Sequence, residues 1–295
     1  IGLLLAALAG CSDVDVQQPV KAGRSAVTVQ LTHDDVVFQG NPLYSPDGAW
    51  ILFEADVAGN MDIWMMPAGG GEPIQVTTDP AFDSTAFWAP DGRRFVFESE
   101  RSGYKNLWIW DLDATGDNPT RLTEGPWNDG SPCWSSDGAW VAYESDRQAG
   151  GGQEIWVSPT DGGEAIRLTT GGVGIYHRTA DFSPDSATLV FESNREEGHS
   201  ALFTLPVTGG EPLRITPLAN YEGHPTWSPD GSEIAYEGSG VGGIQVFVIH
   251  ADGGAALQVT EDGGYWPRWA PDGSKIVYGA WGAGEPNLWT VEVDW

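Results

Sequence analysis

The sequence predicts an all-β fold, a single six-bladed β-propeller in which an N-terminal strand joins the last blade and closes the ring. Three observations predict it: a turn motif that occurs six times, repeat lengths of 42 to 48 residues, and many turn-forming residues. The 295 residues include 40 Gly and 20 Pro, which favours short strands and tight turns over long helices. A repeat of this length is the size of a four-stranded propeller blade.

Each repeat begins with an aromatic residue followed by a turn of the Ser-Pro-Asp-Gly type. Pro restricts φ to about −65°, and Gly supplies the positive φ that closes a hairpin. The aromatic residue ends the innermost strand, where we expect it to pack between blades. Because the turn Asp occurs in every repeat, we interpret it as architecture. These residues are Asp47, Asp91, Asp137, Asp185, Asp230 and Asp272.

Three further strands follow each turn, and the fourth ends in a Thr after an aliphatic residue. The last repeat stops after its third strand, whereas residues 26–32 carry the same ending, Leu31-Thr32, ahead of the first repeat. We therefore expect residues 26–32 to complete the sixth blade, which removes exposed sheet edges. The predicted propeller covers residues 26–295.

The N-terminus is typical of an export signal. Residues 1–10 are apolar and uncharged but too few to span a bilayer, which needs about 20. With no initiator Met or basic start, we expect this signal peptide to be truncated. Leu8-Ala9-Gly10-Cys11 resembles the lipobox of bacterial lipoproteins, which implies cleavage before Cys11 and lipidation of Cys11. Residues 11–25 are then the lipidated Cys and a flexible linker.

The charge excludes several classes of function. With 42 acidic and 14 basic side chains the formal charge is −28, so we expect no nucleic-acid binding and no general attraction to anionic lipid. Membrane attachment is therefore expected through lipid on Cys11. Lipidation there leaves Cys133 without a partner for an intramolecular disulfide. Ser12 after the lipobox implies a lipid-anchored protein of the bacterial cell envelope, at the outer membrane facing the periplasm.

The repeats resemble the PD40 (WD40-like) repeats of the TolB family of propellers, because the six turns, the aliphatic–aromatic pairs such as Ile63-Trp64, and the Thr endings keep register. This resemblance implies a periplasmic binding module, since TolB docks a peptidoglycan-associated lipoprotein on its propeller. Here a lipobox stands where TolB has an N-terminal α/β domain, which puts the full TolB role in doubt.

Comparing the repeats with one another separates architecture from candidate function. A Glu recurs on the second strand of five repeats, at 54, 98, 144, 192 and 237, and three of these are followed by Ser-x-Arg. We interpret these side chains as structural hydrogen-bonding or ion-pairing groups. The loop entering each innermost strand varies, and propellers bind ligands at such channel mouths. The candidate binding residues are Gln39, Asp83, Asp129, Tyr176, His177, Arg178, Tyr221, Glu222, His224, Tyr265, Trp266 and Arg268.

Two functions from different classes fit this pattern. The first is a non-catalytic binding or scaffold module for an envelope protein or polysaccharide, because no Gly-x-Ser-x-Gly, His-Glu-x-x-His or phosphate-loop motif occurs. The alternative is a metal-dependent, lyase-like enzyme acting on polysaccharide, since related propeller lyases hold a His-bound metal. No cofactor is expected, but His177, His224 and Glu222 are weak candidates for a divalent cation in the channel. A regulatory propeller that has lost a peptidase domain is a third hypothesis.

Overall fold

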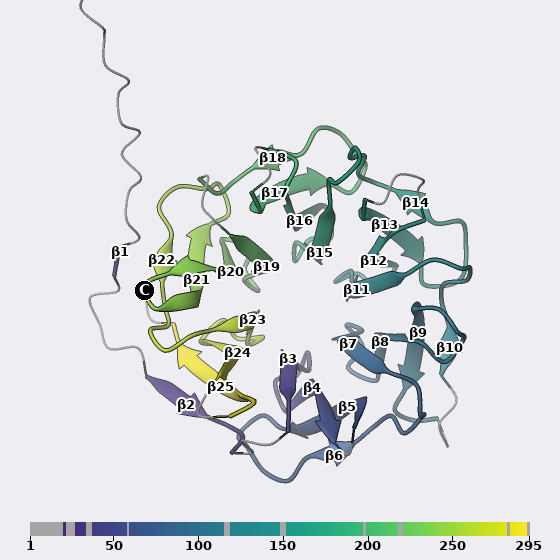
Figure 1. Ribbon diagram of the computed structural model, residues 1–295, viewed down its shortest axis with the longest axis horizontal. Helices are drawn as coiled ribbons and strands as arrows, with labels where there is room; N and C mark the ends of the chain where they lie inside the picture. Colours follow the sequence, from purple (N-terminus) through teal and green to yellow (C-terminus); the bar gives the residue numbers. More distant parts are fainter. Residues whose placement is uncertain are drawn as a thin grey trace, which may run out of the picture.

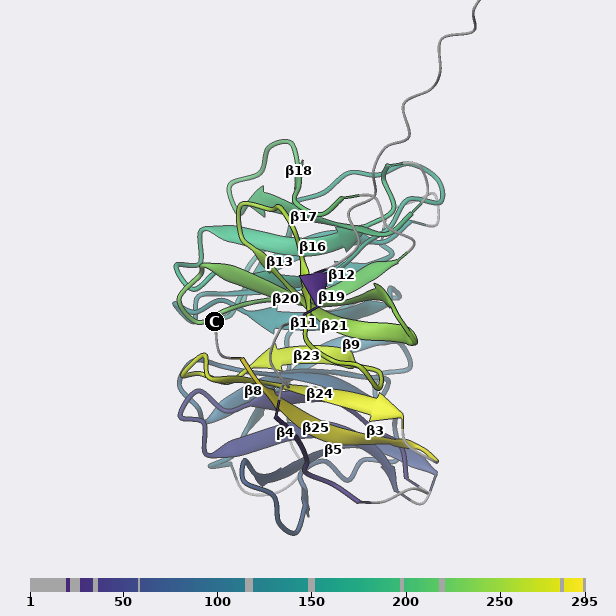
Figure 2. The ribbon, with the colours of Figure 1, turned by 90° about the vertical axis from the view of Figure 1, so that its left-hand side faces the viewer.

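Six sheets are arranged around a central axis in the computed structural model (Figure 1), which confirms the predicted six-bladed propeller. The structure describes residues 20–21, 27–33, 37–57, 59–114, 119–147, 152–196, 199–217, 221–281 and 284–293. Within these ranges no helix is long and apolar enough to cross a membrane. Figure 2 shows the same ring from the side, with the blade strands running between its two faces.

The first three blades follow one another in sequence, each with its innermost strand first. Blade 1 consists of β3 (Gln39–Tyr44), β4 (Trp50–Val57), β5 (Asn60–Pro67) and β6 (Ile74–Gln75). Blade 2 consists of β7 (Asp83–Trp88), β8 (Arg94–Ser99), β9 (Asn106–Asp111) and β10 (Thr120–Arg121). Blade 3 consists of β11 (Asp129–Trp134), β12 (Trp140–Ser145), β13 (Glu154–Pro159) and β14 (Ile166–Arg167).

The remaining blades include two N-terminal strands. Blade 4 consists of β15 (His177–Phe182), β16 (Thr188–Ser193), β17 (Ala201–Pro206) and β18 (Leu213–Arg214). Blade 5 consists of β19 (Glu222–Trp227), β20 (Glu233–Gly240), β21 (Gly243–His250) and β22 (Leu257–Gln258), and β1 (Val20–Lys21) pairs parallel with β22. Blade 6 consists of β23 (Tyr265–Trp269), β24 (Lys275–Trp281), β25 (Pro286–Glu292) and β2 (Thr28–Gln30).

The N-terminal strand closes the ring as predicted. β2 pairs antiparallel with β25, with Val29 opposite Thr290. Thr32 then occupies the same position as the terminal Thr of the other blades, because its Oγ1 accepts the backbone N–H of Leu288 at 2.9 Å. The sixth sheet is thus completed by residues at the opposite end of the chain.

The Thr endings of the other five blades have the same structural use. In blade 1 the backbone N–H of Ile63 donates to Thr77 Oγ1 at 3.0 Å. The N–H of the corresponding third-strand residue donates to the equivalent Thr in each remaining blade, at 2.9 to 3.0 Å. Each hydroxyl therefore satisfies a buried backbone donor where the short fourth strand ends.

The hydrophobic core lies between neighbouring blades. One cluster joins Ile155 of blade 3 to Phe191 and Phe203 of blade 4, all fully buried. Complete burial of such side chains stabilises the fold by about 1.5–3 kcal/mol each. The turn Asp residues hold the hairpins at one face, as the side chain of Asp47 accepts hydrogen bonds from Ser45 Oγ at 2.6 Å and the Ala49 N–H at 3.0 Å.

Candidate binding site in the central channel

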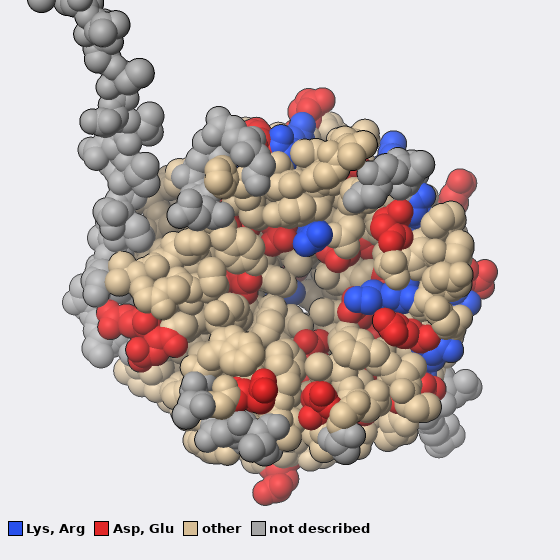
Figure 3. Space-filling model, in the orientation of Figure 1, with Lys and Arg blue, Asp and Glu red and all other residues tan. Residues whose placement is uncertain are grey.

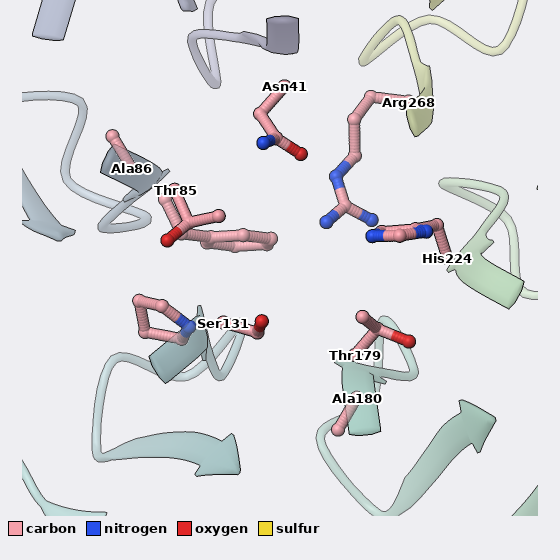
Figure 4. A pocket seen from close by; sticks show the side chains of 10 residues that line it. Asn41, Thr85, Ala86, Ser131, Thr179, Ala180, His224 and Arg268 are labelled. Carbon is pink, nitrogen blue, oxygen red and sulfur yellow. The ribbon is translucent and has the colours of Figure 1, made fainter. Parts of the chain in front are cut away.

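The central channel is lined by one residue of special backbone conformation from most blades. One residue near the start of each innermost strand has a positive φ of 45° to 52°: the third residue in blades 1 to 5 and the second in blade 6. All but one of these six residues line a cavity on the axis (Figure 4). Each lies in a β-bulge, where the pairing register with the second strand shifts. A bulge re-aims a side chain, and in five blades the bulge residue faces the channel. These residues are Asn41, Thr85, Ser131, Thr179, His224 and Trp266.

The second-strand Glu residues hold these bulges in place. Glu54 Oε2 accepts the backbone N–H of Thr85 at 2.9 Å, and Glu237 Oε2 accepts that of Trp266 at 2.8 Å. Glu98, Glu144 and Glu192 accept the equivalent N–H of the following blade. The predicted structural role of these Glu residues is confirmed. Their carboxylates link successive blades by accepting backbone N–H groups of the next blade.

The junction between blades 6 and 1 differs from the other five. Gly279 stands where five blades have Glu, and the Trp266 ring occupies the vacated space. A Cβ on Gly279 would approach the Trp266 ring to 3.0 Å, and a Cβ on Gly40 would approach the same ring equally closely. Phe38 packs edge-on against this ring with centroids 5.8 Å apart. An aromatic cluster therefore replaces a carboxylate where the ring is closed.

The cavity has an arginine side chain near its centre. Arg268 extends from β23 into the channel, and Figure 4 shows its guanidinium beside the ring of His224 and facing the space between Asn41 and Thr179. Phe87 forms part of the wall, with the Arg268 Cζ 5.7 Å from its ring centre. The empty space is about 410 Å³, part of which is open to solvent.

His224 is held by carboxylates behind it. Its Nδ1 lies 3.0 Å from Glu237 Oε1, which also accepts the Tyr221 hydroxyl at 2.6 Å. Burial lowers the pKa of His224, but Glu237 and Glu192 outweigh burial, so that the net direction is upward. Burial raises the pKa of Glu237, yet its interactions with His224 and the Tyr221 hydroxyl make the net direction downward. The pair is thus favoured in its charged form.

Five predicted candidates start the innermost strands and lie inside the protein. Gln39, Asp83, Asp129, His177 and Glu222 are at most 6% exposed. They therefore sit within the blades and do not face the channel surface. Their ligand-binding role stays a prediction, and it now requires access to buried side chains.

The first-strand Asp residues pair with the Arg of the Ser-x-Arg motif. Asp83 lies 2.8 Å from Arg101 Nη2, and Asp129 lies 2.8 Å from Arg147 Nη2. Burial raises the pKa of Asp83 to about 6 despite its hydrogen bond to Ser99 and the nearby Arg101 charge. These ion pairs join the first strand to the segment after the second strand, and they give the Arg of the motif a structural partner in blades 2 and 3.

Four further candidates are half-buried at the start of the innermost strands: Tyr176, Arg178, Tyr221 and Tyr265. The Arg178 guanidinium stacks on Tyr176, with Cζ 4.3 Å from the ring centre. Figure 3 shows acidic and basic side chains around the central opening of the face seen in Figure 1. With Trp266 and Arg268, these residues make the rim and wall polar and aromatic.

The weak metal candidates are not brought together. His177 Nε2 lies 3.7 Å from Glu154 Oε2, His224 pairs with Glu237, and the Glu222 carboxyl interacts with Thr216. Across the described ranges no three His, Cys, Asp or Glu side chains are placed to share one ion. The divalent cation considered from the sequence stays a prediction.

The sequence prediction missed most of the channel lining. Asn41, Thr85, Ser131 and Thr179 lie two residues after the predicted first-strand positions, on the other side of a bulge. The sequence does carry a signal there. The residue at this position varies among the six repeats (Asn, Thr, Ser, Thr, His and Trp), and Pro or Ala follows it in each repeat. A bulge changes which residues face the axis, and simple alternation does not predict it.

Comparisons with known proteins agree with this architecture. Residues 175–294 match the PD40 family, described as the TolB β-propeller domain, and residues 80–190 match the dipeptidyl peptidase IV N-terminal region. The uncharacterized protein Atu1656 of Agrobacterium fabrum is 36% identical over 75 residues. That match spans 25% of this chain and only 25% of the relative.

Solved structures with different activities share the fold. TolB from Acinetobacter baumannii superposes with a TM-score of 0.67 at 18% identity, covering 87% of this chain and 63% of TolB. An oligogalacturonate lyase in complex with manganese gives 0.64 at 16% identity, covering 95% and 96%. XC5397 from Xanthomonas campestris, a gluconolactonase, gives 0.68 at 15% identity, covering 91% and 90%. At these identities the matches show the fold alone.

Proposed function

Because this chain is a TolB-like β-propeller with PD40-type repeats, we propose that it is a non-catalytic binding module for a protein or polymer of the bacterial cell envelope. The observation that carries the proposal is the contrast between repeated and variable positions. The turn Asp, the capping Thr and the bridging Glu recur and have structural partners, whereas the channel-facing position differs between blades. Variation on a uniform scaffold is what a specific binding surface requires.

The proposal places the binding surface at the face where the innermost strands begin. Tyr176 and Arg178 stack on one another there, and the channel containing His224 and Arg268 lies on the axis. Rigid aromatic and arginine side chains are the residues that most often dominate binding energy at protein interfaces. The hairpin turns occupy the opposite face and are satisfied by their own Asp residues.

We also propose that the module is anchored through lipid on Cys11 at the outer membrane, facing the periplasm. Cys11 lies outside the described residues, so this part rests on the lipobox-like sequence alone. Two or more acyl chains give stable attachment, whereas one gives only marginal binding.

Affinity capture from envelope extracts tests the proposed function. The full chain should enrich a specific protein or polymer, and Tyr176→Ala with Arg178→Gln should reduce its recovery at least tenfold, because the stacked pair is lost. His177 is left unchanged, since it is buried. Arg93→Gln, at the exposed turn of the opposite face, is the matched control. Equal recovery by the double variant and wild type would contradict the proposed site.

A further inference from the structure

Among the described arginines near the channel and the first strands, Arg268 and Arg178 form no ion pair with a carboxylate. Arg178 stacks on Tyr176, whereas Arg268 lines the cavity. The guanidinium of Arg268 carries five N–H donors, and Nη1 donates to the Pro225 carbonyl at 3.5 Å. No carboxylate of a described residue lies within the 4.0 Å ion-pair distance of Arg268, although Arg101 and Arg147 each have one at 2.8 Å. In a chain with a threefold excess of acidic residues, this cation is left with free donors.

The carboxylate of Asp181 interacts with the charge of Arg268 but forms its hydrogen bonds with other groups. Asp181 is close enough for the Arg268 charge to act on it, but its Oδ2 accepts the Trp227 N–H at 2.9 Å. Thr226 also hydrogen-bonds the Asp181 side chain. Asp181 is buried, so its charge partly offsets that of Arg268 without accepting a hydrogen bond from the guanidinium.

The space in front of Arg268 is small, and both polar and apolar side chains line it. Phe87, Pro132 and Ala180 line it, and Figure 4 shows the hydroxyls of Thr85 and Thr179 turned away from its centre. Ser131 is the hydroxyl that Figure 4 shows turned toward the space. A guanidinium in a partly enclosed cavity attracts an anion more strongly than one on an open surface.

We propose that Arg268, assisted by Ser131, forms a subsite for one carboxylate group of a ligand that enters the channel. This deepens the proposed binding function and rests on it. A guanidinium binds a carboxylate through two parallel N–H···O bonds, which the free donors of Arg268 permit. Because Glu237 offsets the charge of His224, the unpaired charge of Arg268 matches a monoanion, whereas a dianion would face the buried Glu residues of the bulges. Repulsion by the outer surface is screened beyond about 8 Å at physiological salt.

Two sources of such a carboxylate are chemically equivalent at this subsite: an acidic sugar and an acidic peptide side chain. The probes are therefore matched pairs, galacturonate with galactose and N-acetyl-glutamate with N-acetyl-glutamine. Binding to the full chain is followed by calorimetry and by the ¹⁵Nε–¹Hε signal of Arg268, which reports on the guanidinium without any substitution. Inorganic phosphate is the dianion comparison.

We expect at least one carboxylate to bind tenfold or more tightly than its neutral partner and to shift the Arg268 signal. Arg268→Gln should reduce that affinity at least tenfold, and Ser131→Ala about threefold. Arg214→Gln removes a half-buried arginine of β18 that pairs with Glu196, and it should leave the affinity unchanged. Arg268→Lys keeps the charge but not the planar fork, so its affinity for the carboxylate should lie between those of wild type and Arg268→Gln. This variant tests the subsite if Arg268→Gln fails to fold.

Three results would overturn the subsite: equal affinity for acid and neutral probes, an unmoved Arg268 signal, or tighter binding of phosphate than of either carboxylate. The galacturonate and glutamate arms identify the source. Envelope capture separates this failure from failure of the proposed function. If Arg268→Gln still recovers the partner and the carboxylates do not bind, the binding module stands and the carboxylate subsite is wrong.

Discussion

At the scale of single residues, repetition in the sequence distinguishes support from candidate function. The five second-strand Glu residues look like a catalytic carboxylate cluster when listed alone. Their partners are backbone N–H groups of the neighbouring blade, as with Glu54 and Thr85, so their task is to hold the bulges. At the repeat position of Arg268 no other blade has an arginine, and its hydrogen bond is a long one of 3.5 Å to the Pro225 carbonyl. Arg268 is therefore the better functional candidate.

Glu222 gives a residue-scale prediction about pH. Burial raises the pKa of its carboxyl to about 7 from 4.5, although Thr216 and Arg214 oppose the shift. A carboxyl with a raised pKa in the fold stabilises the protein below pH 4.5, and this contribution is lost as the pH rises through 7. Glu222→Gln should therefore raise the free energy of unfolding relative to wild type at pH 8.5, by up to roughly 3 kcal/mol.

Urea unfolding at pH 4.5 and pH 8.5 measures this effect. The advantage of Glu222→Gln should largely disappear at the lower pH, where the wild-type carboxyl is protonated in the folded state and about half protonated in the unfolded state. Glu72→Gln, an exposed residue before β6, is the control and should change neither value. A difference between the Glu222 variant and wild type that is the same at both pH values would refute the raised pKa.

At the scale of elements, ring closure depends on one short strand. The N–H of Leu31 donates to the Leu288 carbonyl at 2.8 Å, and the Glu292 N–H donates to the Val27 carbonyl at 3.1 Å. Because a strand alternates every two residues, Val29 also directs its N–H toward β25, whereas Thr28 directs its N–H away. Val27, Val29 and Leu31 thus join this segment to β25.

Proline substitutions test this closure. Val29→Pro removes a ladder hydrogen bond and should lower the free energy of unfolding by about 2–3 kcal/mol, because proline has no N–H to donate. Thr28→Pro, at the neighbouring exposed position, should cost clearly less. Thermal unfolding of both variants gives the comparison. Equal losses would show that residues 28–30 do not form the predicted register.

At the scale of the whole molecule, the charge of −28 bears on the proposed attachment to a membrane. Part of this charge is architectural, since turn Asp residues recur at the hairpins with partners of their own. An anionic membrane repels such a surface and does not retain it. Attachment therefore depends on the proposed lipid at Cys11.

Cys11→Ser should release the protein from the membrane fraction of expressing cells, while wild type remains there after washing with high salt. Cys133→Ala is the matched control, because Cys133 is a buried free thiol and should not affect attachment. Immunoblots of membrane and soluble fractions measure the distribution. Retention of Cys11→Ser in salt-washed membranes would rule out the lipid as the anchor.

The number of blades, the hairpin turns and the closing strand followed from the sequence alone, because they depend on local turn chemistry and a repeated hydrophobic pattern. Thr32 was assigned to the sixth blade by its Leu-Thr ending, and its hydroxyl meets Leu288 there. The channel lining required the tertiary structure. A bulge in every innermost strand turns Thr85 and Ser131 toward the axis and leaves Asp83 and Asp129 buried, paired with Arg101 and Arg147. That choice depends on a carboxylate supplied by the neighbouring blade, about 30 residues away in sequence, as with Glu54 and Thr85, and no local pattern contains it.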